Sequence, residues 1–107
     1  MSNKIIGTFY FKKTQSGNLI GEFTNNGIEE FIVECANIKK NYEINKFDAK
    51  YITTWLVDFD SHTAELEIVK TDLNYILKWY KIKSNKVIFE GTAIVENDVL
   101  IGKYNSK

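Results

Sequence analysis

The stretch Ile5-Ile6-Gly7-Thr8-Phe9 recurs twice in this chain, as Leu19-Ile20-Gly21-Glu22-Phe23 and as Leu100-Ile101-Gly102-Lys103-Tyr104. In an extended strand, the first, third and fifth residues point to the same face. Each copy therefore places an aliphatic side chain, a glycine and an aromatic ring in one row. A glycine inside a strand is typical of a bend, a bulge or a close approach by another backbone. Bends near both ends of the chain predict that the first and last strands pair, with Gly7 and Gly102 on neighbouring strands.

Turn-forming residues separate segments rich in β-branched and aromatic residues along the whole chain, a spacing typical of an antiparallel meander. The predicted strands cover residues 4–13, 18–25, 28–36, 42–46, 50–59, 63–70, 73–83, 86–95 and 98–105. The region 37–49 is also compatible with a loop or a single helical turn. The sequence predicts an all-β, antiparallel, up-and-down barrel of eight or nine strands, formed by residues 1–107 as a single domain. The alternatives are a two-sheet sandwich and a half-open roll.

Alternation of apolar and polar residues predicts which face of each strand is buried. In the strand 28–36, the pattern predicts that Phe31, Val33 and Cys35 point inward and that Glu34 lies on a solvated face. A cysteine among inward apolar side chains is expected to be an inert core thiol rather than a nucleophile.

A second repeat, Tyr-Ile-x-x-Trp, begins at Tyr51 and again at Tyr75. Its aromatic residues are four apart, so in a strand they point to the same side. Barrels of about eight strands are either filled by side chains or leave room for one small ligand. An apolar lining with a few hydroxyl groups is typical of small-molecule pockets. The predicted lining residues are Tyr51, Thr53, Trp55, Tyr75, Trp79 and Tyr104. The alternative is that these rings simply fill the core.

Two classes of function follow from this lining. The first is non-catalytic binding of a small, mostly apolar molecule in the barrel interior. The second is a protein-interaction module with a filled core, such as a small inhibitor or a dimerising subunit. That module predicts an exposed apolar patch around Ile76, Tyr80 and Ile82. An enzyme is less favoured, because His62 is the only histidine and acid–base partners are missing.

Two further motifs carry weaker chemical signals. Asp58, Asp60 and His62 alternate as metal ligands would, but three such residues are also ordinary hairpin-turn chemistry. The segment 78–86 interleaves lysine with aromatic residues, as on platforms that stack single-stranded nucleic acid. Lysines on the wet side of a hairpin explain this segment equally well. We therefore predict no metal site, no cofactor and no nucleic-acid partner.

Composition supports the same exclusions. Lysine and arginine total 14, aspartate and glutamate total 14, and every basic residue is lysine. A net charge of zero provides no field that attracts nucleic acid or an anionic membrane. No apolar run approaches the length that spans a membrane. A single cysteine and a start without a signal-peptide core predict a cytoplasmic protein, with a trimmed secreted chain as the alternative.

The opening residues Gly7-Thr8-Phe9-Tyr10 and the following segment 16–23 resemble the first hairpin of avidin-like and lipocalin-like barrels. Those calycin-like families begin with Gly-x-Trp or Gly-Thr-Trp, followed by a strand that carries Gly-x-Tyr or Gly-x-Phe. The closing stretch from Tyr75 to Tyr104 is similar to the last hairpins of small bacterial barrels of uncharacterised function. The resemblance implies a barrel. It transfers no binding residue, because Phe9 replaces the expected tryptophan and the biotin-contacting loop residues have no match.

Overall fold

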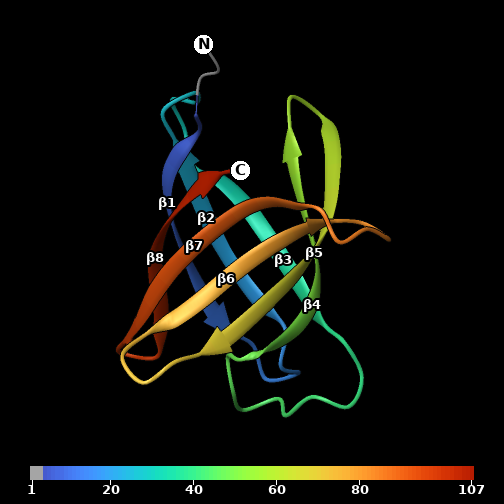
Figure 1. Ribbon diagram of the computed structural model, residues 1–107, viewed down its shortest axis with the longest axis vertical. Helices are drawn as coiled ribbons and strands as arrows, with labels where there is room; N and C mark the ends of the chain where they lie inside the picture. Colours follow the sequence, from blue (N-terminus) through green and yellow to red (C-terminus); the bar gives the residue numbers. More distant parts are fainter. Residues whose placement is uncertain (1–3) are drawn as a thin grey trace.

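The structure, a computed structural model, describes residues 4–107, which form a closed barrel of eight antiparallel strands (Figure 1). The strands are β1 (Ile6–Lys13), β2 (Leu19–Asn25), β3 (Ile32–Ile38), β4 (Ala49–Val57), β5 (Asp60–Lys70), β6 (Tyr75–Lys81), β7 (Val87–Glu96) and β8 (Val99–Ser106). Each strand pairs with its neighbour in sequence, and β8 pairs back with β1. The predicted up-and-down barrel with paired first and last strands is therefore confirmed.

The seam between β1 and β8 places the repeated stretches side by side. Gly7 lies opposite Tyr104, and Phe9 lies opposite Gly102. A Cβ atom on Gly102 would lie 2.7 Å from Cζ of Phe9 and 2.7 Å from Cβ of Ala93, well inside van der Waals contact. The backbone carbonyl oxygen of Thr92 would lie closer still, so glycine is required here because both the neighbouring backbone and the Phe9 ring occupy the space that a side chain would need.

The segment 42–46 is not a strand, so the nine-strand alternative is wrong. A loop of residues 39–48 joins β3 to β4 and lies across one end of the barrel (Figure 1). The ring of Phe47 packs edge-on against Tyr75, with ring centroids 6.3 Å apart. The Phe47 carbonyl accepts a hydrogen bond from the Tyr51 hydroxyl at 2.7 Å. These two contacts hold the loop by interior rings, so it needs no strand partner.

The β4–β5 hairpin extends beyond the barrel at the end opposite loop 39–48 (Figure 1). Its two-residue turn consists of Asp58 and Phe59, with φ angles of 51° and 70°. Two successive residues in this left-handed region are typical of the tight turns that suit the twist of a hairpin. Because the turn is so short, β5 begins at Asp60, three residues earlier than predicted.

The predicted inner face of β3 is wrong. Three residues that were expected inside the barrel are exposed: Phe31, Val33 and Cys35. Glu34 and Ala36 are buried instead. The register with β2 explains the reversal, because Gly21 pairs with Glu34 and Leu19 pairs with Ala36. Residues directly opposite each other share a face of the sheet, and Leu19 and Gly21 point inward.

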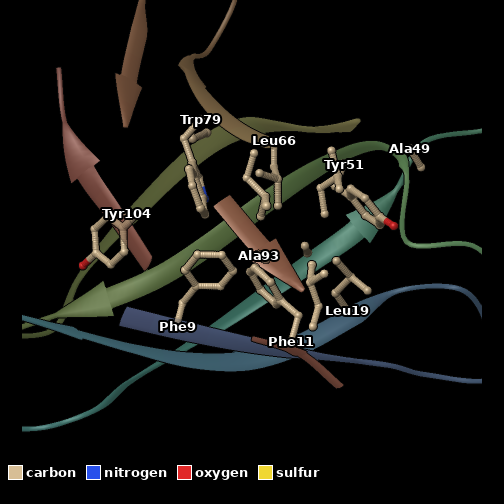
Figure 2. Close-up of a cluster of buried hydrophobic side chains, with 14 residues drawn as sticks. Phe9, Phe11, Leu19, Ala49, Tyr51, Leu66, Trp79, Ala93 and Tyr104 are labelled. Carbon is tan, nitrogen blue, oxygen red and sulfur yellow. The ribbon is translucent and has the colours of Figure 1, made fainter. Parts of the chain in front are cut away.

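The half of the interior next to loop 39–48 is filled. Tyr51, Phe11, Leu19 and Leu100 are among its fully buried side chains. Figure 2 shows Tyr51, Ala49 and Leu19 toward one end of the core, and Phe9, Trp79 and Tyr104 toward the other. Burying a leucine or phenylalanine side chain contributes about 1.5–3 kcal/mol. This packed half stabilises the fold, which leaves the other end for a binding site.

Candidate ligand-binding site

A half-open cavity of about 40 Å³ lies in the end of the barrel away from loop 39–48. Its lining consists of six aromatic side chains and one carboxyl group: Phe9, Phe23, Trp55, Trp79, Phe89 and Tyr104, with Glu34. Each of these seven residues comes from a different strand, and only β5 contributes none. The pocket therefore depends on closure of the whole barrel and not on any single loop.

The rings of the pocket hold one another in place by edge-to-face contacts. Phe9 and Trp79 lie 5.6 Å apart at 83°, and Phe89 and Tyr104 lie 5.6 Å apart at 82°. Such arrangements are favoured by the ring quadrupoles. The Tyr104 hydroxyl also accepts a hydrogen bond from Asn25 Nδ2 at 3.0 Å. These contacts fix the aromatic wall in the absence of any ligand.

Glu34 sits beneath these rings and is only 4% exposed. Its Oε2 accepts a hydrogen bond from Thr53 Oγ1 at 2.5 Å and one from Trp79 Nε1 at 3.0 Å. Burial raises the pKa of Glu34 to about 7, although both hydrogen bonds favour the ionised form and oppose this rise. The carboxyl group therefore keeps its proton to a much higher pH than an exposed glutamate does.

The second carboxyl oxygen of Glu34 faces the pocket. Among residues 4–107, no side chain or backbone amide donates a hydrogen bond to Oε1; the bonds to this carboxyl group both reach Oε2. In the same part of the chain, no polar side-chain atom of a non-exposed residue is both fully covered and unpaired. Oε1 must therefore retain some accessible surface, and Glu34 lines the cavity. This oxygen is available to a ligand.

The structure divides the six residues that the sequence proposed for the lining. Trp55, Trp79 and Tyr104 surround the pocket. Thr53 is fully buried below it and reaches the site only through its bond to Glu34. The other two, Tyr51 and Tyr75, lie in the opposite half of the barrel against Phe47.

Glu34 is the site residue that the sequence analysis missed. The alternation of apolar residues in this segment favours Phe31, Val33 and Cys35 as the inner row, so the pattern points to the wrong face. The useful signal is Gly21 on the preceding strand. Gly21 pairs with Glu34 and lies in a row with the inward Leu19, but the sequence does not show which residue of the next strand pairs with it.

The outer surface does not expose the apolar patch at the place where the interaction-module alternative predicts it. Ile76, Tyr80 and Ile82 are half-buried rather than exposed. The Tyr80 hydroxyl donates to Glu67 Oε1 at 3.3 Å, which ties this ring to its neighbouring strand. More exposed apolar side chains lie elsewhere, at Ile20, Val33, Ile94 and Ile101 on β2, β3, β7 and β8.

The residues of the possible metal motif in the β4–β5 hairpin do not converge on one point. His62 stacks on Trp55, with ring centroids 5.8 Å apart and planes inclined by 16°. Within residues 4–107, no three His, Cys, Asp or Glu side chains gather closely enough to hold a metal ion.

This same part of the chain contains no helix with the length and apolar character needed to cross a membrane.

No protein-family model, curated protein or solved structure matches this chain. The comparisons give no link between this barrel and the avidin-like or lipocalin-like families, so that resemblance stays a prediction. The residues and shape of the pocket are therefore the basis for assigning a function to this chain.

Proposed function

We propose that this chain is a non-catalytic binding protein that takes a small molecule, or the small end of a larger one, into the pocket around Glu34. The proposal depends on one observation: a pre-arranged aromatic wall surrounds the carboxyl group of Glu34, whose accessible Oε1 has no donor within residues 4–107. A buried carboxyl group lowers stability unless it is paired, so packing alone favours an apolar residue here. Departures of this kind are expected at functional sites.

The size of the cavity limits what it accepts. A cavity needs roughly 10–15 Å³ to hold one water molecule, so the cavity of about 40 Å³ holds about three water-sized groups. A ligand therefore inserts a short group beside Glu34, and the rest of the molecule lies in the mouth against rings such as Trp55 and Phe23. The contact area is mostly apolar, in keeping with the apolar ligand that the sequence predicts.

The lining supports binding rather than catalysis. Among residues 4–107, the titratable side chains of the lining are Glu34 and Tyr104, and no serine, threonine, cysteine or lysine lies in the wall beside them. The hydroxyl closest to the carboxyl group belongs to Thr53, which is fully buried below it. A carboxyl group with a raised pKa can itself act as a general acid or base, so the case for binding rests on the lack of a nucleophile in the lining that residues 4–107 form.

Trp55 and Trp79 are the only tryptophans of the chain, and both line the pocket, so intrinsic fluorescence reports directly on occupancy. We expect small amines or alcohols with a four-carbon chain to change this emission in a saturable manner. Trp55→Leu should weaken binding about tenfold, near the contribution of one aromatic contact, while Trp79 still reports. The matched control is Tyr42→Leu, an exposed ring in loop 39–48 at the far end. Equal binding by Trp55→Leu and the wild type would place the ligand outside the pocket.

A further inference from the structure

We infer that the group this pocket accepts is a protonated primary amine, with its ammonium against Glu34 Oε1 and its methylene stem among the aromatic rings. This inference rests on the proposed function and names the chemical class of its ligand. It covers a small free amine and the terminal ammonium of a larger molecule, which share the same recognised chemistry.

The first argument is the missing counter-charge. The ion pairs within residues 4–107 are Lys39–Glu65, Lys46–Glu43 and Lys107–Glu90, all of them away from the pocket. Glu34 therefore has hydrogen bonds but no cationic partner. A buried carboxylate without a partner is costly, and a ligand cation would supply the charge that the protein does not. An anionic ligand would meet the same carboxylate and be repelled.

The aromatic wall favours the same sign of charge. Phe9, Trp79 and Tyr104 form a triangle of rings with centroid separations of 5.6, 6.2 and 6.0 Å. The faces of such rings carry partial negative charge and attract a cation that lies within about 6 Å of the centroid, with tryptophan the most effective. A neutral apolar ligand would satisfy the rings but would leave Oε1 without a donor.

Size and hydrogen bonding favour a primary ammonium over a quaternary one. An NH₃⁺ group donates charge-assisted hydrogen bonds, which are about twice as strong as neutral ones, whereas a quaternary nitrogen has no hydrogen to donate. A cavity for about three water-sized groups accommodates one NH₃⁺ and two methylene groups. A trimethylammonium head would require the ring wall to move apart.

Two other titratable groups lie near Glu34 and enter the design of the experiment. Tyr104 on β8 lines the pocket, and burial raises the pKa of its phenol further above neutrality, so it stays uncharged there. His62 on β5 stacks against Trp55 at the mouth and is exposed. The remaining pocket residues of β1, β2, β4, β6 and β7 are phenylalanine and tryptophan, which do not titrate.

The test compares three probes with the same number of carbons: n-butylammonium, n-butanol and butyrate. Tryptophan emission is titrated at constant ionic strength at pH 5.5 and pH 8.5. The amine stays cationic throughout, because alkyl ammonium groups titrate near pH 10. If only ionised Glu34 binds the cation, a pKa of about 7 predicts roughly thirtyfold tighter binding at pH 8.5 than at pH 5.5. Butanol should bind at least tenfold more weakly than the amine at pH 8.5, and butyrate more weakly still.

Variants assign this behaviour to the carboxylate. Glu34→Gln preserves shape and hydrogen bonding but should remove both the preference for the amine and its pH dependence. His62→Asn should retain both, which excludes histidine charge as their source. Equal binding of amine and butanol to the wild type, or an amine preference that survives in Glu34→Gln, overturns the inference while leaving a ligand pocket in place. Failure of all three probes to bind at concentrations up to about 0.1 M overturns the proposed function as well.

Discussion

The ring of Phe9 on β1 covers Gly102 on β8, and the ring of Tyr104 on β8 covers Gly7 on β1. A Cβ atom on Gly7 would lie 2.7 Å from Cε1 of Tyr104, just as one on Gly102 would lie 2.7 Å from Cζ of Phe9. The first and last copies of the repeated stretch therefore interlock, each supplying the ring for the other's glycine. Both rings also line the pocket, so the seam that closes the barrel forms part of the candidate site.

Gly102→Ala should lower the free energy of unfolding by about 1–3 kcal/mol, because the new methyl group collides with the Thr92 carbonyl oxygen and the Phe9 ring and overpacks the seam. Gly27→Ala is the matched control. There a Cβ atom would approach only the Asn25 side chain, at 3.3 Å, and the expected change is within about 0.5 kcal/mol. Urea unfolding of the two variants provides the comparison. Equal stabilities would show that the ring can move away from the seam.

Glu34→Gln should stabilise the protein above neutral pH. The folded pKa of about 7 lies above the ordinary value of 4.5, so the folded state binds more protons than the unfolded state between these values. The contribution of Glu34 is therefore most favourable below pH 4.5 and declines as the pH rises toward 7. The stability gained by Glu34→Gln should be about 2–3 kcal/mol larger at pH 8 than at pH 5. Urea unfolding at both pH values measures it, and a pH-independent difference would contradict a buried, titrating carboxyl group.

Tyr51→Phe should loosen loop 39–48 without changing the pocket. The substitution removes the hydroxyl that donates to the Phe47 carbonyl at 2.7 Å and accepts from Lys13 Nζ at 3.2 Å. The expected cost is about 1 kcal/mol, with faster amide hydrogen exchange across the loop. Tyr42→Phe, which changes an exposed ring of the same loop, should leave exchange unaltered. A change in amine binding caused by Tyr51→Phe would show that the two ends of the barrel are coupled.

Phe59→Gly should raise the free energy of unfolding by about 0.5–1 kcal/mol, since glycine adopts the left-handed region without the steric cost of a side chain. Phe59 has a φ angle of 70°, and its side chain is fully exposed, so no packing is lost on removal. Phe59→Ala retains a Cβ atom and should leave stability nearly unchanged. A thermal melt separates the two. Destabilisation by Phe59→Gly would mean that the ring makes a contact in solution.

The rings of the pocket could be predicted from the sequence because their positions follow from strand periodicity and from the repeated stretch. The alternation within each strand suffices to place three of these rings, Trp55, Trp79 and Tyr104, on the inner face, without knowing which strands pair. The alternation does not show how far along the barrel axis each inward residue lies, because neighbouring strands are offset along that axis. Tyr51 pairs with Leu66, which in turn pairs with Trp79, so equivalent positions of the Tyr-Ile-x-x-Trp repeat lie at different levels.

The inward position of Glu34 could not be predicted from the sequence. Hydrophobic alternation shows only which residues are apolar, whereas the register with β2 decides which residues of β3 point inward. The register pairs Glu34 with Gly21, whose strand neighbour Leu19 points inward, and brings the carboxyl group near the Thr53 and Trp79 donors. Each of these partners is distant in sequence from Glu34. In the sequence alone, a polar residue whose hydrogen-bond partners are all distant along the chain cannot be told from a surface residue.

The filled half of the barrel has a consequence for how the site selects its ligand. Among residues 4–107, Phe11, Leu19, Tyr51 and Leu100 are fully buried and pack that half, opposite the open side of the cavity. Under the proposed function, a ligand places only its leading few atoms in the cavity, and the rest of the molecule lies in the mouth or in solvent. A small free molecule and the end of a polymer chain that carry the same terminal group would then compete for the site.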